Sequence, residues 1–131
     1  MIKISDNTNL NRREYKPPRG AIAFAPELVS FILRGEKQST YRFGLKYDYI
    51  QVGDKVDIID SSTEEVKARV VVKAKASVIF KNLPLAFDKH ESYRDKNHQR
   101  QVLGGYYAYI GREIRDDDVF LVFEFECMER T

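Results

Sequence analysis

Residues 35–42 bring together several side chains that could do chemistry. They read Gly-Glu-Lys-Gln-Ser-Thr-Tyr-Arg, and so place an amine, two hydroxyls and a guanidinium directly after a predicted helix. Alternate residues of an extended chain face the same side, so Thr40 and Arg42 share one face, and the preceding loop can turn Lys37 towards them. Ammonium and guanidinium groups beside hydroxyls suit an anion, whereas a lysine whose charge is disfavoured by burial and a nearby arginine can take a proton from a hydroxyl. The residues by themselves favour anion binding over catalysis and leave both open.

The elements on either side must hold this segment in place. Residues 26–34 read as a helix, with Pro26 in its first turn and Gly35 as its C-terminal cap. A second helical region, with a break, is expected from Asn82 to about Tyr109. The strands that we expect cover residues 21–24, 37–42, 56–59, 68–80 and 119–125. Strands joined by hairpins, with helices inserted after the first strand and before the last, predict a small α+β fold around a closed or partly closed β-barrel of about five to six strands.

Composition limits the classes of function. A chain of 131 residues with 43% hydrophobic and 32% charged residues predicts one globular domain, and its net charge of +2 is too small to coat nucleic acid or a membrane, so any polyanion site must be a local patch. Cys127 is the only cysteine, which excludes an internal disulfide and a cysteine-based zinc site. The sequence starts without a signal-peptide pattern and has no apolar run near the ~20 residues that span a bilayer. We therefore expect a cytoplasmic protein with no membrane partner.

Residues 1–20 differ from the rest of the chain. They lack an apolar period, contain Pro17-Pro18, and carry basic residues that outnumber the acidic Asp6 and Glu14. The basic residues are Lys3, Arg12, Arg13, Lys16 and Arg19. We predict a flexible or loosely docked basic arm, followed by one domain over residues 21–131. A solvated tail is the favoured interpretation, and an arm that follows phosphates is the alternative.

Aromatic residues cluster around the polar segment. Four aromatic residues are interleaved with two basic ones: Tyr41, Phe43, Tyr47 and Tyr49 with Arg42 and Lys46. Such an arrangement can stack a nucleobase, although core packing explains some of these aromatic residues. His90 and His98 have no third ligand at a suitable spacing, so no metal site is expected. His90 is predicted to be solvated, with assistance to an active site as the alternative.

The polar segment and its flanks resemble the ASCH domain family. The shared motif is a helix followed by Gly-x-Lys-x-x-Thr-x-Arg and then a Gly-Asp turn, here Gly53-Asp54, and the closing strand at Phe123–Phe125 stands where that family places its last barrel strand. The resemblance covers about residues 21–129. It implies a PUA-like β-barrel whose motif lines a cleft, and a ligand that is RNA or contains a nucleobase.

One branch of that family hydrolyses the acetyl group of N4-acetylcytidine with a lysine, a threonine and a glutamate. Lys37 and Thr40 match the first two, and an ungapped count places Glu91 at the third, with Asp88 and Asp95 as other carboxylates in range. The resemblance thus implies Lys37 as base, Thr40 as nucleophile and Glu91 as acid, with no metal or other cofactor.

The resemblance also implies residues that contact the ligand. Arg42 matches a basic position of the family. The residues themselves add Tyr41 and Ser39 as ligand contacts, with the alternative that Ser39, which alternates with Thr40, points elsewhere. For nucleic acid, the expected contacts are Lys37, Arg42, Lys46, Arg12 and Arg13. The partner is then RNA or a nucleoside or nucleotide, and the protein is expected to be a monomer or weak dimer. A non-catalytic RNA-binding module and a protein-interaction domain remain the alternatives to a small amidohydrolase.

Overall fold

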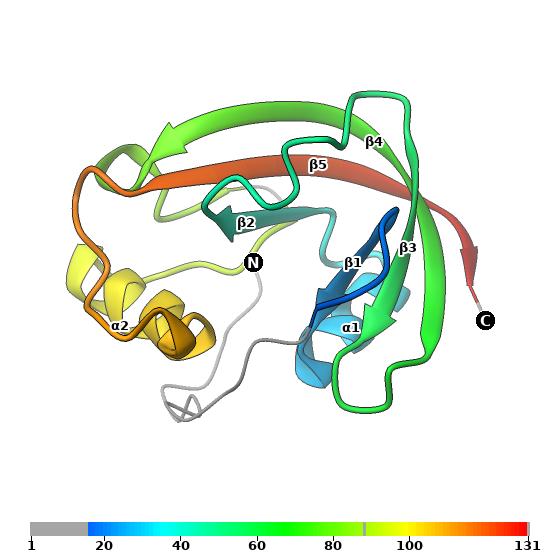
Figure 1. Cartoon of the computed structure of the whole chain (residues 1–131), viewed down its shortest axis with the longest axis horizontal. Helices are drawn as coiled ribbons and strands as arrows, with labels where there is room; N and C mark the ends of the chain where they lie inside the picture. The colour runs from blue at the N-terminus through cyan, green and yellow to red at the C-terminus, as the bar shows by residue number, and fades with distance from the viewer. Residues whose placement is uncertain (1–15, 88, 131) are drawn as a thin grey trace.

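Five strands form one mixed sheet in the computed structural model, which describes residues 16–87 and 89–130 (Figure 1). The strands are β1 (Ala21–Phe24), β2 (Ser39–Phe43), β3 (Lys55–Asp60), β4 (Val66–Ile79) and β5 (Val119–Arg130). Their order in the sheet is β1-β3-β4-β5-β2, with β1 parallel to β3 and the other neighbours antiparallel. Because β5 lies between β4 and β2, the most hydrophobic strand of the chain is not an edge.

The sheet is strongly curved but open. Figure 1 shows β4 and β5 as long, bent strands, and their pairing shifts register between Arg69 and Val70 and again between Val72 and Ala74. Such bulges bend a strand and increase its twist. The predicted α+β class and number of strands are confirmed, whereas the described residues leave β1 and β2 as separate edges rather than closing a barrel.

The two helices come in the predicted order, one after the first strand and one before the last. The helix α1 (Pro26–Leu33) follows β1, and α2 (Lys96–Tyr106) precedes β5. Two short 3₁₀ turns cover Phe80–Asn82 and Ala108–Ile110. Within the part of the chain that the structure describes, no helix is long and apolar enough to cross a membrane.

The prediction that the second helical region starts at Asn82 is wrong. Residues 83–87 and 89–95 are irregular, and the helix begins only at Lys96. Asp95 caps it, because its carboxylate accepts a hydrogen bond from the His98 backbone N–H at 2.8 Å. A long irregular connection therefore precedes α2 and carries His90 and Glu91.

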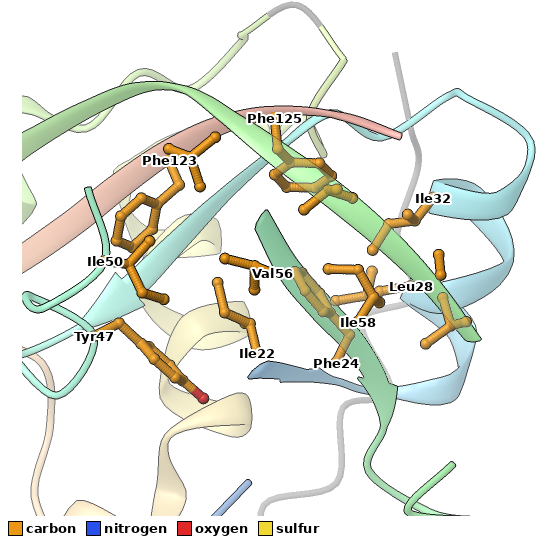
Figure 2. Close-up of a cluster of buried hydrophobic side chains, with 14 of the residues drawn as sticks. Ile22, Phe24, Leu28, Ile32, Tyr47, Ile50, Val56, Ile58, Phe123 and Phe125 are labelled. Carbon is orange, nitrogen blue, oxygen red and sulfur yellow. The ribbon is translucent and has the colours of Figure 1, made fainter. Parts of the chain in front are cut away.

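Two hydrophobic clusters form the core. The first packs α1 against the sheet and includes the labelled residues of Figure 2, among them Phe24 from β1, Ile58 from β3 and Phe123 from β5. The second lies under α2 and is built on Phe80, Phe120 and Val102. Since β5 contributes to both clusters, one strand joins the two halves of the core.

Gly35 ends α1 and directs the chain into the polar segment. Its φ is +75°, its N–H donates to the Ile32 carbonyl at 3.0 Å, and the Glu36 N–H donates to the Phe31 carbonyl at 2.9 Å. This pair of bonds is the Schellman arrangement of a helix end. The Lys37 N–H also donates to Phe31, at 3.2 Å, so the helix end fixes where Lys37 begins.

A Gly35→Ala variant should lose about 1 kcal/mol of unfolding free energy, because a left-handed conformation costs a residue with a Cβ about that much. No atom lies within 4 Å of the added Cβ, so the effect should come from the backbone alone. Gly104→Ala is the matched control, since its Cβ also meets nothing but its position is inside α2. It should be neutral or stabilising by up to about 1 kcal/mol. Urea denaturation of both variants measures the difference, and equal effects at the two positions would contradict the assignment of Gly35 as a cap.

Candidate functional site

A cavity of about 430 Å³ lies between the two core clusters. Its volume is within the range of about 300–1,000 Å³ that small-molecule sites occupy. The wall comes from β1, the start of α1, β2, the irregular segment before α2 and the end of α2. Its aromatic members are Phe24, Tyr41, Phe43, Tyr47, His90, Tyr93, Tyr106, Tyr107 and Tyr109. The cavity therefore offers flat apolar faces around a small number of polar groups.

Lys37 and Glu91 form a buried ion pair at this cavity. The Lys37 ammonium contacts the Glu91 carboxylate, and the two residues are only 1% and 4% exposed. Neighbouring residues join the two segments, because the Gln38 N–H and the Ser39 hydroxyl both donate to the Lys89 carbonyl, at 2.7 and 3.2 Å. The segment that carries Lys37 thus holds the segment that carries Glu91.

Burial changes the proton affinity of both partners. It lowers the pKa of Lys37, and the attraction of Glu91 only partly opposes that effect. Burial also acts to raise the pKa of Glu91, but the charge of Lys37 and its hydrogen bond outweigh it, so that pKa is below its usual value. Glu91 is therefore a carboxylate at neutral pH, and Lys37 gives up its proton more readily than an exposed lysine does.

Thr40 and Arg42 form a second polar pair in the cavity wall. The Thr40 hydroxyl accepts a hydrogen bond from Arg42 Nε at 2.9 Å. The Arg42 guanidinium lies 4.1 Å from the centroid of the Phe24 ring, which gives it a cation–π contact. Arg42 could also pair with Asp48 or Asp54, two carboxylates that follow it in the chain. Among the described residues it does not: Asp48 pairs with Lys75 at 3.1 Å, and Asp54 accepts from the Gln51 N–H at 2.8 Å.

The prediction of a solvated His90 is wrong. This residue is 2% exposed, lines the cavity, and stacks on Tyr41 with ring centroids 3.9 Å apart and planes at 17°. Burial, with the nearby charge of Lys37, lowers the pKa of His90 to about 4, so the ring is neutral at pH 7. The only feature of the sequence that could have placed His90 in the site is its position next to Glu91.

The remaining predicted ligand contacts divide into two groups. Tyr41 and Lys46 line the cavity together with Lys37, Thr40 and Arg42. Ser39 is buried outside the cavity wall, where its hydroxyl bonds to the Lys89 carbonyl. The structure thus gives Ser39 a contact that joins two segments of the protein.

The remaining predicted site residues either have another contact or lie outside the part of the chain that the structure describes. Asp95 caps α2 and is not part of the cavity wall. Asp88, Arg12 and Arg13 lie outside the described residues. Across residues 16–87 and 89–130, no group of three or more His, Cys, Asp or Glu side chains could hold a metal ion.

Comparison with known proteins identifies the fold. No protein-family model and no curated protein matches this chain. Among solved structures, an ASCH domain from Lactobacillus crispatus is 19% identical, with a TM-score of 0.59 over 84% of this chain and 79% of that one. A DUF984 protein of Enterococcus faecalis is 13% identical, with a TM-score of 0.62 over 79% and 68% of the two chains. A mutant ASCH protein from Zymomonas mobilis is 14% identical, with a TM-score of 0.56 over 83% and 70%.

These likenesses establish the architecture of the chain. At identities below 20% they concern the fold rather than the activity. The protein shares the fold of these ASCH domain structures, as the resemblance at residues 35–42 implied. What the cavity binds, and whether it breaks a bond, has to be argued from its own side chains.

Proposed function

We propose that the cavity binds a nucleobase-containing ligand and hydrolyses an N-acyl amide on it, in the manner of N4-acetylcytidine deacetylation. The observation that carries this proposal is the buried Lys37–Glu91 pair beside the Thr40–Arg42 pair in one aromatic cavity. The two pairs supply a base, a carboxyl group, a hydroxyl and a cation within a single site.

The aromatic wall supports binding of a flat ring. Tyr41 and Tyr107 are both in the wall, and the Tyr107 hydroxyl donates to the Tyr41 carbonyl at 2.9 Å, which fixes the position of one against the other. Stacking of a base on an aromatic side chain contributes about 1–3 kcal/mol. A nucleobase is the ligand class that this wall fits best.

The polar groups support a reaction in which the protons balance. One proton passes from the Lys37 ammonium to Glu91, and the neutral amine then takes the Thr40 proton as Oγ1 attacks the acyl carbon. Glu91 returns its proton to the nitrogen as the C–N bond breaks, and water later hydrolyses the acyl group from Thr40. Arg42 Nε already bonds to Thr40 Oγ1, so its positive charge stabilises the negative charge that develops on Oγ1 as that atom loses its proton and attacks.

Release of cytidine from N4-acetylcytidine tests the proposal. The wild-type protein should release cytidine, measured by chromatography, and Lys37→Met should lower kcat by about 10²–10⁴-fold because general-base catalysis contributes that much. Lys55→Met, at an exposed lysine on β3 outside the cavity wall, is the matched control and should keep full activity. No release by the wild type at any protein concentration would refute the hydrolase proposal.

A non-catalytic RNA-binding module is the second candidate. A smaller hollow beside the cavity is lined by Lys16, Arg19 and Tyr49, and it shares Lys46 and Tyr47 with the cavity wall. The Arg19 guanidinium lies 3.8 Å from the centroid of the Tyr49 ring. Three cations next to a base-binding cavity suit a phosphate backbone. Binding of RNA that weakens as salt rises, without release of cytidine, would favour this candidate.

A further inference from the structure

The contacts of His90 determine which ring nitrogen carries its proton. Nδ1 lies 2.9 Å from the Glu91 backbone carbonyl oxygen and 3.4 Å from a Glu91 carboxylate oxygen. A carbonyl oxygen can only accept a hydrogen bond, so Nδ1 must be the donor. The neutral ring has a single N–H, and Nε2 is left with a free lone pair.

The lone pair on Nε2 has no partner within the described parts of the chain. His90 makes its polar contacts through Nδ1 and its ring contacts with Tyr41 and Tyr93. Buried polar atoms are nearly always hydrogen-bonded, and this ring belongs to the cavity wall. The missing donor is therefore expected to come from the contents of the cavity.

The surroundings of His90 keep Nε2 an acceptor. The positive charges of Lys37 and Arg42 disfavour a second proton on the ring, and the single carboxylate of Glu91 is already paired with Lys37. The stack on Tyr41 fixes the plane of the ring, so Nε2 has a defined direction. A rigid, neutral acceptor in a site of this kind discriminates strongly against ligands that lack the matching donor.

We propose that His90 is a specificity residue whose Nε2 accepts a hydrogen bond from an N–H group of the ligand, so that the cavity selects acyl groups joined to the nucleobase through a secondary amide. This inference rests on the proposed function and deepens it. It adds to that function a requirement on the substrate: the amide nitrogen must carry a hydrogen.

Two probes and three variants test the requirement. The probes are N4-acetylcytidine and its N4-methyl derivative, which lacks the N–H. His90→Gln keeps an acceptor near the position of Nε2, His90→Asn keeps only a donor near Nδ1, and His90→Phe keeps only the ring on Tyr41. Dissociation constants are measured by calorimetry with Thr40→Val present in every protein, so that N4-acetylcytidine is bound but not hydrolysed; the wild type in this comparison is the protein that keeps His90. Thermal unfolding confirms that each variant is folded.

The wild type should bind N4-acetylcytidine at least about tenfold more tightly than the methylated probe, which is the effect of one well-formed hydrogen bond. His90→Gln should keep this preference, whereas His90→Asn and His90→Phe should each lose about tenfold for N4-acetylcytidine and change little for the methylated probe. ¹⁵N NMR of the ligand-free wild type should show His90 protonated at Nδ1 only.

Some outcomes would refute only the role of His90, and one would refute the proposed function on which that role rests. Two outcomes would refute the role of His90 and leave the proposed function standing. One is protonation at Nε2 in the free protein, and the other is a His90→Phe variant that prefers the N–H probe as strongly as the wild type does. Failure of the wild type to bind either probe would refute the proposed function, and the inference would fall with it.

Discussion

The free energy of unfolding of a Glu91→Leu variant should be about 3–5 kcal/mol lower than that of the wild type at pH 7. The change leaves the Lys37 ammonium buried without its counter-charge, and an uncompensated buried charge costs about that amount. Glu65→Leu is the matched control, because Glu65 pairs with Lys67 on the surface at 3.4 Å. An exposed pair contributes only about 0–1 kcal/mol, so the control should be close to wild type. Urea denaturation followed by circular dichroism measures both.

The stability of Glu91→Leu should also depend on pH in a defined direction. In the wild type, the Glu91 carboxylate opposes the lowering of the Lys37 pKa by burial. Without that carboxylate, the pKa of Lys37 falls further below its value in the unfolded chain. The unfolded chain then binds more protons than the folded one between those two pKa values, and stability rises as the pH rises through that window. Measurements at pH 7 and pH 9.5 should show the variant more stable at the higher pH.

Removing both charges together should restore most of the stability that Glu91→Leu loses. Lys37→Met with Glu91→Leu replaces the pair by apolar side chains, and such replacements are often neutral or stabilising. The double variant should be folded and inactive. A double variant as unstable as Glu91→Leu would show that the pair contributes through its hydrogen bond and shape rather than through its charges.

Thr40→Val should abolish deacetylation of N4-acetylcytidine, with a loss of about 10³-fold or more, because removing a nucleophile removes the covalent route. The variant keeps the shape of the side chain and should lose only about 1 kcal/mol of stability, the contribution of the hydrogen bond from Arg42. Activity is measured as release of cytidine and stability by urea denaturation.

Two further variants isolate the hydroxyl of Thr40. Thr40→Ser keeps it and should stay within about tenfold of the wild type. Thr63→Val makes the same change in an exposed hairpin outside the cavity and should have no effect on activity. Full activity in Thr40→Val would show that a water molecule, and not Thr40, attacks the acyl carbon.

The local parts of the fold could be predicted because each depends on neighbours in sequence. Pro26 and Gly35 mark the ends of α1, and the backbone bonds at Gly35 are made within a few residues. The strands follow from alternating or continuous apolar residues, and β5 is the clearest example. The presence of Lys37, Thr40 and Arg42 at one cavity follows from the same local order, since all three lie within six residues of each other.

The parts that depended on distant contacts could not be predicted. Charged residues between Asn82 and Lys96 have helical propensity, yet residues 83–87 and 89–95 form no helix. In that segment the Lys89 carbonyl accepts hydrogen bonds from the Gln38 N–H and the Ser39 hydroxyl. That contact, and the stack of His90 on Tyr41, join residues about fifty positions apart in the chain. No periodicity in the sequence reports them, which is why a buried histidine was expected to be solvated.

The position of β2 in the sheet has a consequence for how the protein is made. The strand β2, which carries Thr40, has β5 as its only strand neighbour in the described sheet, with Ser39 opposite Glu124. A ribosome adds about 5–20 residues per second, so the strand waits on the order of ten seconds before its pairing strand exists. The cavity therefore cannot be assembled until synthesis has passed Val119, the first residue of β5, and a ligand cannot assist folding until that strand has emerged. A nascent chain that stalls before β5 would present unpaired edges on β2 and β4, and unpaired strand edges promote aggregation.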